Sequence, residues 1–241
     1  GFLIVCYNII KRMIRLIKAK KVDSTNDWIK KNLPKLKDLD SLVAETQDSG
    51  KGRNSKNWFS PRGGLWMSVL IEKFPGNDGA LSLLCATAVC EVLEENSLLA
   101  NIKWPNDIIL KGKKLGGILI EKVQEKFIVG IGLNLNLSKS DFPIPLKDVV
   151  ITSKEVLHNE LDIEKVAKEI IKKIAEDRNI LDRVHKKYLK LSGDINEKVT
   201  INDGKEVFTG KVVEIQPDGG IKIRNEDTEK VFYSGSLSYL S

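Results

Sequence analysis

The sequence predicts an α+β fold, in which a mixed β-sheet with helices packed on one face is followed by a small C-terminal β-barrel. Most predicted strands are joined by hairpin turns, and the helical patterns gather in two places. After residue 194 the pattern changes to short alternating strands with glycine-containing turns. The 241 residues are 41% hydrophobic and 30% charged, which allows a packed core and excludes a wholly disordered chain.

The first half of the chain is predicted from alternation, helical apolar runs and turn residues. Ser24 is a suitable N-cap for a helix that Pro34 helps to stop. A run that is apolar on most of its circumference, at 80–96, predicts a core helix. In order, we expect a strand at 14–22, a helix to about residue 32, strands at 41–47 and 65–71, a helix at 80–96, short strands at 102–104 and 108–110, and paired strands at 115–123 and 126–136.

The second half begins with a proline-containing loop at 138–153. A charged amphipathic pattern over 163–190 predicts a long helix with a break near 177–179. Residues 191–194 are a predicted linker, and the short strands and turns after them predict the barrel. We therefore expect three parts: a leader of unassigned role at 1–12, a main domain at 13–192 and a barrel domain at 195–241.

The distribution of charge and cysteine excludes several classes of protein. Residues 1–22 hold six basic side chains and no acid, so the remainder carries 33 charges of each sign and offers no broad nucleic-acid face. Three cysteines and two histidines exclude a disulfide scaffold and a four-ligand zinc site, which favours a reduced, cytoplasmic setting. The apolar start of the chain is too short to span a membrane, and its basic residues follow the apolar run, unlike a secretory signal.

Glycines locate a candidate site, since nine of the 18 fall at 50–64, 112–117 and 130–132. Glycines beside strand ends let the backbone approach a ligand, and their amides can bind anions. The first segment carries Lys51, Arg53 and Lys56 and ends at Trp58, without the spacing of a P-loop or a dinucleotide fold. It is either a loop that wraps a phosphate ester or a solvated basic loop.

The other two segments add polar side chains at strand ends. Asn106 and Asp107 follow Pro105, where they could hold a divalent cation or a ribose. Lys114 lies at the start of an apolar strand, so it either binds an anionic ligand or forms a structural ion pair with Asp107. Gly130 and Gly132 either leave backbone bare for a ligand or mark a bulge in a central strand.

Taken together and in this order, five motifs resemble those of the biotin protein ligases. They are Ser24-Thr25-Asn26, Gly50-Lys51-Gly52-Arg53 with Trp58, Lys103-Trp104-Pro105-Asn106-Asp107, Lys114-Leu115-Gly116-Gly117-Ile118-Leu119 and Gly130-Ile131-Gly132-Leu133-Asn134. The resemblance covers about residues 13–241. It implies a class II synthetase-like catalytic core at 13–192 and an SH3-like barrel at 195–241.

The resemblance also implies an activity: biotin and ATP give biotinyl-5′-AMP and pyrophosphate with Mg²⁺, and biotin is then transferred to a lysine of a biotin carboxyl carrier domain. The implied catalytic residues are Lys114, Arg53 and Asp107, and Asp107 is also a candidate metal ligand. The implied biotin-binding residues are Ser24, Thr25, Asn26, Gln47, Gly50, Lys51, Gly52, Arg53, Lys114, Gly117, Gly130 and Gly132. The implied adenylate-binding residues are Arg53, Trp58, Asn106, Lys114, Ile131 and Asn134.

The chain departs from the family pattern in its basic loop. Lys51 stands where the family usually has arginine and Ser55 where it usually has glycine, while Arg53 is retained. Lysine keeps the charge but loses the bidentate fork, so loop ordering or ligand affinity is expected to change.

Family members that repress transcription carry an N-terminal DNA-binding domain, for which the residues before Ser24 are too few. We therefore expect a purely enzymatic form without DNA or membrane binding, which the family implies is a homodimer. The alternatives are a lipoate ligase with related chemistry and, in a different class, a basic nucleic-acid-binding protein. The uncharged Ser24–Asn26 and Gln47 set favours the cyclic urea of biotin over the dithiolane of lipoate.

Overall fold

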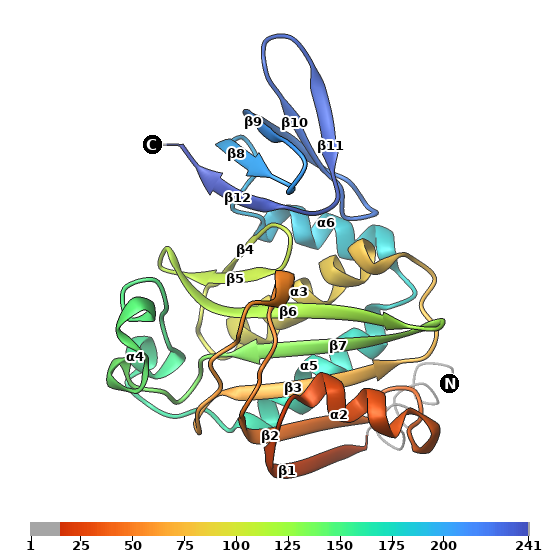
Figure 1. Cartoon of the computed structure of the whole chain (residues 1–241), viewed down its shortest axis with the longest axis vertical. Coiled ribbons are helices and arrows are strands. Elements are labelled where there is room, and N and C mark those ends of the chain that lie inside the picture. The colour runs from red at the N-terminus through yellow and green to blue at the C-terminus, as the bar shows by residue number, and fades with distance from the viewer. Residues whose placement is uncertain (1–14, 241) are drawn as a thin grey trace.

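The computed structural model describes residues 15–240, which form two β-sheets and the helices that cover them (Figure 1). The leader expected at 1–12 lies outside the described residues. The larger sheet has the strand order β1-β2-β3-β7-β6-β5-β4, with β1 and β2 parallel and every other pair antiparallel. This confirms the predicted mixed sheet.

The strands of the larger sheet are β1 (Leu16–Val22), β2 (Ser41–Gln47), β3 (Leu65–Ile71), β4 (Asn101–Lys103), β5 (Asp107–Leu110), β6 (Lys113–Val123) and β7 (Lys126–Leu133). The helices are α2 (Thr25–Asn32), α3 (Asp78–Glu95), α4 (Ser153–Leu157), α5 (Ile163–Asp177) and α6 (Leu181–Leu191). The C-terminal strands are β8 (Lys198–Asn202), β9 (Val207–Ile215), β10 (Ile221–Arg224), β11 (Glu229–Phe232) and β12 (Ser236–Tyr239).

The two faces of the larger sheet are covered differently. Along β3, Leu65, Met67, Val69 and Ile71 belong to the main apolar core with residues of α3, α5 and α6, which lie behind the sheet in Figure 1. The expected gathering of helices on one face holds for these three. Helix α2 is the exception, because its Ile29 packs on the opposite face against Leu70 and Ile128. Alternation along β3 thus supplies apolar side chains to both faces.

The structure confirms the break in the predicted long helix and shortens one predicted strand. The predicted long helix is broken as expected, into α5 and α6. The strand expected to reach residue 136 ends at Leu133, because the carbonyls of Asn134 and Leu135 then accept from the amides of Ser153 and Lys154. The Asn136 side chain is fully engaged with the backbone of Leu161, accepting at 2.9 Å and donating at 2.8 Å.

The C-terminal strands form a five-stranded antiparallel sheet in the order β11-β10-β9-β8-β12. Its two end strands, β11 and β12, pair only with β10 and β8 within the described part of the chain, so the sheet is not a closed barrel. The predicted barrel is corrected to an open, curled sheet. Strand alternation predicts sheet formation, but closure depends on the stagger between strands, which local pattern does not determine.

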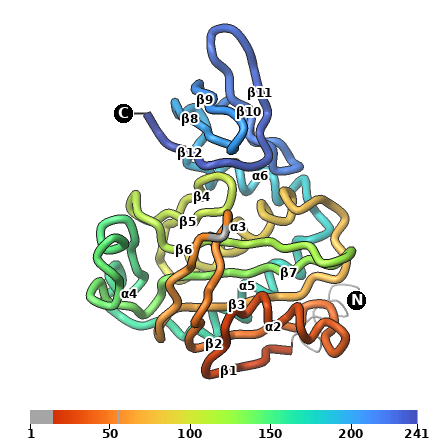
Figure 2. Tube along the Cα trace, viewed as in Figure 1, coloured from red at the N-terminus to blue at the C-terminus, as the bar shows by residue number. Residues whose placement is uncertain are grey.

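The C-terminal sheet packs on the end of the larger sheet near β4 and α6, as Figures 1 and 2 show. Its buried Val199, Ile201 and Val212 belong to the same apolar core as α3. The Trp104 indole donates to the Gly219 carbonyl at 2.8 Å. Gly79 meets the same turn so closely that an added Cβ would lie 2.1 Å from the Asp218 oxygen. The C-terminal sheet is therefore docked firmly.

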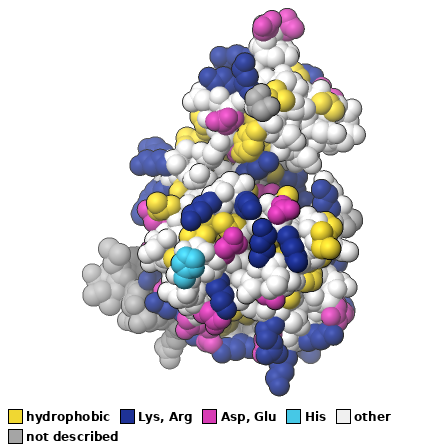
Figure 3. Space-filling view, turned by 90° about the vertical axis from the view of Figure 1, so that its left-hand side faces the viewer, with side chains coloured by type: hydrophobic (Ala, Val, Ile, Leu, Met, Phe, Trp, Pro, Cys, Tyr) yellow, Lys and Arg dark blue, Asp and Glu magenta, His cyan; other side chains and the backbone are white. Residues whose placement is uncertain are grey.

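Two observations on the described part of the chain concern its surface charge and its helices. Figure 3 shows basic side chains interspersed with acidic ones on the face that it presents, without one broad positive field. Between residues 15 and 240, no helix is both long enough and apolar enough to cross a bilayer.

The cap of α3 provides a test of the fold. Asn77 accepts a hydrogen bond from the Ala80 amide at 2.8 Å, which satisfies one of the free amides of the first turn. We expect Asn77→Ala to lower the free energy of unfolding by about 1 kcal/mol, measured by urea denaturation. Asn77→Ser, which can still cap, is the control. An equal loss in both variants would contradict this role.

Candidate functional site

A cavity of about 440 Å³ opens on the face of the larger sheet that carries α2. Its floor is formed by β6 and β7, and its walls come from the start of α2, the loop after β2, the β4–β5 turn, residues 149–150 and residues 235–237. Figure 2 shows the loop after β2 crossing in front of β7 and β6. Segments far apart in the sequence therefore surround one space.

Three glycines make the floor of this cavity. A Cβ on Gly130 would lie 2.6 Å from the Asn26 side-chain oxygen, and one on Gly132 would lie 2.6 Å from the Trp58 indole nitrogen. A Cβ on Gly117 would approach Trp58, Lys114 and Asp107 at 3.4 to 3.6 Å. Side chains at Gly130 and Gly132 would displace Asn26 and Trp58, so these positions require bare backbone.

One end of the cavity is lined by uncharged hydrogen-bonding groups. The Gln47 side-chain oxygen accepts from the Thr25 amide at 2.8 Å, and its nitrogen donates to the Ser60 hydroxyl at 2.8 Å. Ser24 caps α2 through the Asp27 amide, as the sequence predicts. Buried Ser68 on β3 lies 2.7 Å from the Thr25 hydroxyl and 2.5 Å from the Asn26 oxygen. These hydrogen bonds hold the side chains of Thr25, Asn26 and Gln47 in fixed orientations.

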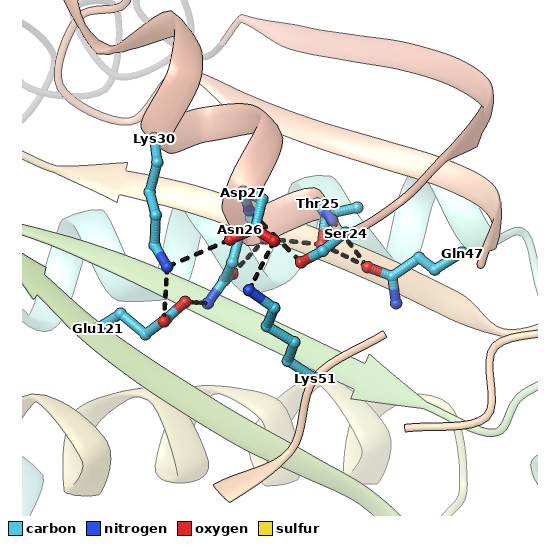
Figure 4. Close-up of polar contacts among 9 residues, drawn as sticks. Ser24, Thr25, Asn26, Asp27, Lys30, Gln47, Lys51 and Glu121 are labelled. Carbon is cyan, nitrogen blue, oxygen red and sulfur yellow. Dashed lines mark hydrogen bonds and ion pairs between the residues drawn. The ribbon is translucent and has the colours of Figure 1, made fainter. Parts of the chain in front are cut away.

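A chain of charges connects this end to the basic loop (Figure 4). Glu121 on β6 accepts from the Asn26 amide at 2.7 Å and pairs with Lys30 at 2.6 Å. Lys30 also pairs with Asp27, whose other oxygen lies 2.6 Å from the Lys51 ammonium. Burial acts to raise the pKa of Asp27, but the hydrogen bonds from Lys51 and Lys30 outweigh it and leave that pKa below its ordinary value.

The basic loop is folded over the cavity floor by backbone pairing. The Trp58 amide donates to the Gly50 carbonyl at 2.8 Å, and the Gly52 amide donates to the Lys56 carbonyl at 2.7 Å. A Cβ on Gly50 would lie 2.4 Å from the Trp58 oxygen, so Gly50 shapes the loop and does not line the cavity. The buried Trp58 indole nitrogen has no hydrogen-bond partner within the described residues.

The opposite end of the cavity is strongly cationic. Over the whole cavity, Asp107 is the one carboxylate among the lining residues, against five cations: Lys51, Arg53, Lys56, Lys103 and Lys114. Lys51 is paired with Asp27 of α2, whereas Arg53, Lys103 and Lys114 lie at this end, beside Asn106, Tyr239 and Asp107. The Lys114 ammonium lies 2.6 Å from the Asp107 oxygen and 5.1 Å from the centre of a Trp58 ring. Burial lowers the pKa of Arg53, which Asp107 partly opposes, and this marks a cation removed from bulk water. Such an end suits a polyanion.

A β-bulge turns Lys114 toward the cavity. Ile108 pairs with Gly116 and Ile109 pairs with Lys114, which leaves Leu115 as an extra residue on β6. Leu115 is fully buried in the main core, whereas a Cβ on Gly117 would lie 3.5 Å from the Lys114 side chain. Without the bulge, Lys114 and Gly117 would point to opposite faces, because their spacing is odd.

A divalent cation would need ligands from outside the protein at this site. The part of the chain that the structure describes contains no group of three or more His, Cys, Asp or Glu side chains that could hold a metal. Asp107 supplies one carboxylate to the cavity. This donor set fits Mg²⁺ only when phosphate oxygens complete its shell, as is usual for that ion.

The structure brings together around one cavity all the site residues expected from the sequence except Gly50. Sequence reasoning missed Glu121 and Ser68, which hold Asn26, and it missed the two distant wall segments at 149–150 and 235–237. It quoted Lys103 within a family motif but gave that residue no role in the site. Glu121 had a weak signal, as an acid at the end of an apolar strand. The wall segments had none, because only the packing of distant elements brings them to the site.

Comparison with known proteins gives a consistent result. The model of the Biotin/lipoate A/B protein ligase family matches residues 18–138. The bifunctional ligase/repressor BirA of Bacillus subtilis is 39% identical over 134 residues, covering 50% of this chain and 40% of that protein. BirA of Bacillus spizizenii is 30% identical over 216 residues, covering 81% of this chain and 65% of that protein. The chain thus spans less than two thirds of either Bacillus relative.

The solved structures agree with these relatives over most of the chain. The biotin protein ligase from Aquifex aeolicus in complex with biotin and ATP is 32% identical, with a TM-score of 0.84, and the match covers 94% of this chain and 98% of that one. The biotin acetyl coenzyme A carboxylase synthetase from Helicobacter pylori, at 23% identity and a TM-score of 0.71, shares the fold. The family model covers about half of the residues and the folds coincide, so the chain belongs to the Biotin/lipoate A/B protein ligase family.

Proposed function

We propose that this protein is an ATP-dependent biotin protein ligase, which activates biotin as biotinyl-5′-AMP and then transfers it to a lysine of a biotin carboxyl carrier domain. The observation that carries the proposal is the division of one cavity into an uncharged hydrogen-bonding end and a cationic end. The neutral cyclic urea of biotin suits the first, and the triphosphate of ATP suits the second. The Aquifex aeolicus relative, described with biotin and ATP, supports this pairing.

In the first step a biotin carboxylate oxygen attacks the α-phosphorus of ATP, an O–P bond forms, and pyrophosphate leaves. No base is needed, because a carboxylic acid is already ionised at neutral pH. The barrier is the repulsion between two anions, which fixed cations reduce where charge moves. Lys114 and Arg53 are the cations that we assign to this task. Mg²⁺, held by phosphate oxygens with Asp107, would neutralise charge on the leaving pyrophosphate.

The basic loop has a separate task, because the mixed anhydride formed in this step reacts with water. Trp58 already lies over Gly132, and the Lys51–Asp27 pair fastens the loop to α2. Excluding water from a closed site protects reactive intermediates. We therefore assign the loop at 48–62 to shielding the adenylate.

The second step requires a base, since the acceptor lysine is protonated at neutral pH with a pKa of about 10.4. Asp107 is the one carboxylate among the lining residues, and we assign it to orient the amine or accept its proton. The amine then attacks the acyl carbon, an amide bond forms, and AMP leaves.

The proposed function also carries two expectations on assembly and setting. The family resemblance implies a homodimer. Cys85 and Cys90 are free and buried, which suits a reducing, cytoplasmic setting.

Removing the Lys114 ammonium tests the first step. We expect Lys114→Met to reduce biotin-dependent ATP–pyrophosphate exchange by about 10²–10³-fold, the usual loss for one preorganised donor at a reacting centre. Lys122→Met, which removes an exposed cation from the same strand, is the control and should be close to wild type. A near-wild-type exchange rate for Lys114→Met would remove Lys114 from the reaction.

Asp107→Asn separates the two steps. We expect transfer of biotin from preformed biotinyl-5′-AMP to a carrier domain to fall at least about tenfold more than adenylate formation, because general-base loss typically costs 10²–10⁴-fold. Both half-reactions are measured separately by single-turnover kinetics. Asp148→Asn, at an exposed ion pair, is the matched control. Equal losses in both steps would assign Asp107 to nucleotide or metal binding instead.

Calorimetry distinguishes biotin from lipoate as the substrate. We expect biotin to bind with a measurable heat, and its affinity to rise when a non-hydrolysable ATP analogue is present, because both ligands order the same loop. Lipoate, whose dithiolane lacks the urea donors and acceptors, should bind at least about tenfold more weakly. Tighter binding of lipoate would make the protein a lipoate ligase.

A further inference from the structure

Asp194 is a buried carboxylate that the proposed reaction does not use. It follows α6, has no exposed surface, and both of its oxygens are engaged. One accepts from the Trp104 amide at 2.7 Å and the other from the Tyr239 hydroxyl at 2.7 Å. The preceding Gly193 amide donates to the Ile102 carbonyl at 2.9 Å. The segment predicted as a linker is thus fastened to β4.

Because the Asp194 carboxylate is buried, its two hydrogen bonds are important for the stability of the fold around it. Burial raises the pKa of Asp194, and the bonds from Tyr239 and Trp104 act in the opposite direction, together with nearby Lys103. A carboxylate buried without partners is strongly destabilising, so the two donors must stay in place for the segment to remain folded. The Lys103 ammonium also lies 4.6 Å from the centre of the Tyr239 ring.

The two donors belong to the two walls at the cationic end of the cavity. Trp104 begins the turn that carries Asn106 and Asp107. Tyr239 ends β12, whose other end, with Gly235, Ser236 and Leu237, lines the cavity. One carboxylate therefore ties the β4–β5 turn to the C-terminal sheet.

Arg53 contacts both walls. Its guanidinium reaches the Asn106 side-chain oxygen at 3.5 Å and the Gly235 carbonyl at 3.4 Å, one acceptor from each wall. These contacts are long, so a small shift of either wall would release the guanidinium. The spacing of the two walls therefore determines where Arg53 can point, and Asp194 bonds to one residue of each wall.

We propose that Asp194 is a positioning residue, which places Arg53 by holding the β4–β5 turn and β12 at a fixed separation. This inference rests on the function proposed above, where Arg53 acts at the phosphate of ATP. It also assigns the C-terminal sheet a role in the site, which is to carry one of the two acceptors of Arg53. Tyr239 is the residue through which Asp194 holds that sheet.

Two variants and a matched control test this proposal. Asp194→Asn replaces one acceptor by a donor, and Tyr239→Phe removes one hydroxyl while keeping the ring beneath Lys103. We expect hydrogen exchange in residues 101–110 and 234–240 to accelerate about tenfold or more in both, with 65–71 unchanged. Tyr233→Phe, which removes an exposed hydroxyl bonded to Asp218 in the turn between β9 and β10, should match wild type. Unchanged exchange in Tyr239→Phe would overturn the proposal, even if Asp194→Asn fails to fold.

Kinetics distinguish positioning from a general loss of structure. We expect kcat for pyrophosphate exchange to fall about tenfold in Tyr239→Phe, with a smaller change in the KM for ATP, because Arg53 is assigned to the step in which charge moves. In the Arg53→Met background, the further substitution Tyr239→Phe should change the rate less than twofold, because the Arg53 guanidinium that Tyr239 helps to position is already absent. If the rate losses of the two single variants multiply in full in the double variant, the proposal is overturned. If wild type shows no exchange activity with biotin, the proposed function fails, and the hydrogen-exchange result still decides the role of Asp194.

Discussion

The site depends on the close approach of side chains to the bare backbone of β6 and β7. Asn26 and Trp58 occupy the space that side chains at Gly130 and Gly132 would fill, and Lys114 lies beside Gly117. Three separate segments can therefore meet on one small area of sheet. Each segment carries a different chemistry: uncharged donors and acceptors, an aromatic ring, and cations. Their proximity comes from the missing side chains beneath them.

Electrostatics at the cavity follow from this arrangement. Four cations other than Lys51 line the cavity with one carboxylate, whereas Lys51 and the charges of Asp27, Lys30 and Glu121 around the uncharged end have partners of opposite sign. The chain from Glu121 through Lys30 and Asp27 to Lys51 leaves no unpaired charge among those four residues. The excess positive charge is thus restricted to the end where a polyanion would lie, and an attractive field there does not disturb the neutral end.

The C-terminal sheet is part of the same structural unit as the larger sheet. Trp104 bonds to Gly219, Asp194 bonds to Tyr239, and Gly79 packs against the Asp218 turn. Trp104, at the start of the β4–β5 turn, bonds to both Asp194 and Gly219. These bonds fasten the turn that carries Asn106 and Asp107, and rigid supports are what a preorganised site requires.

Local pattern was sufficient for most of the elements, and together with the family resemblance it named many of the residues that line the cavity. Period-two alternation and the Ser24 cap predicted the strands and α2, and the glycine clusters predicted where a ligand would approach. The bulge at Leu115, the open C-terminal sheet, Glu121 beneath Asn26, and the engagement of Asp194 could not be predicted this way. Each depends on which strand register and which distant partner the folded chain selects. By itself the sequence determined the chemical groups and their order. Tertiary structure alone decided which face Lys114 points to and which walls enclose it, because strand register and long-range packing are set by the whole core and not by neighbouring residues.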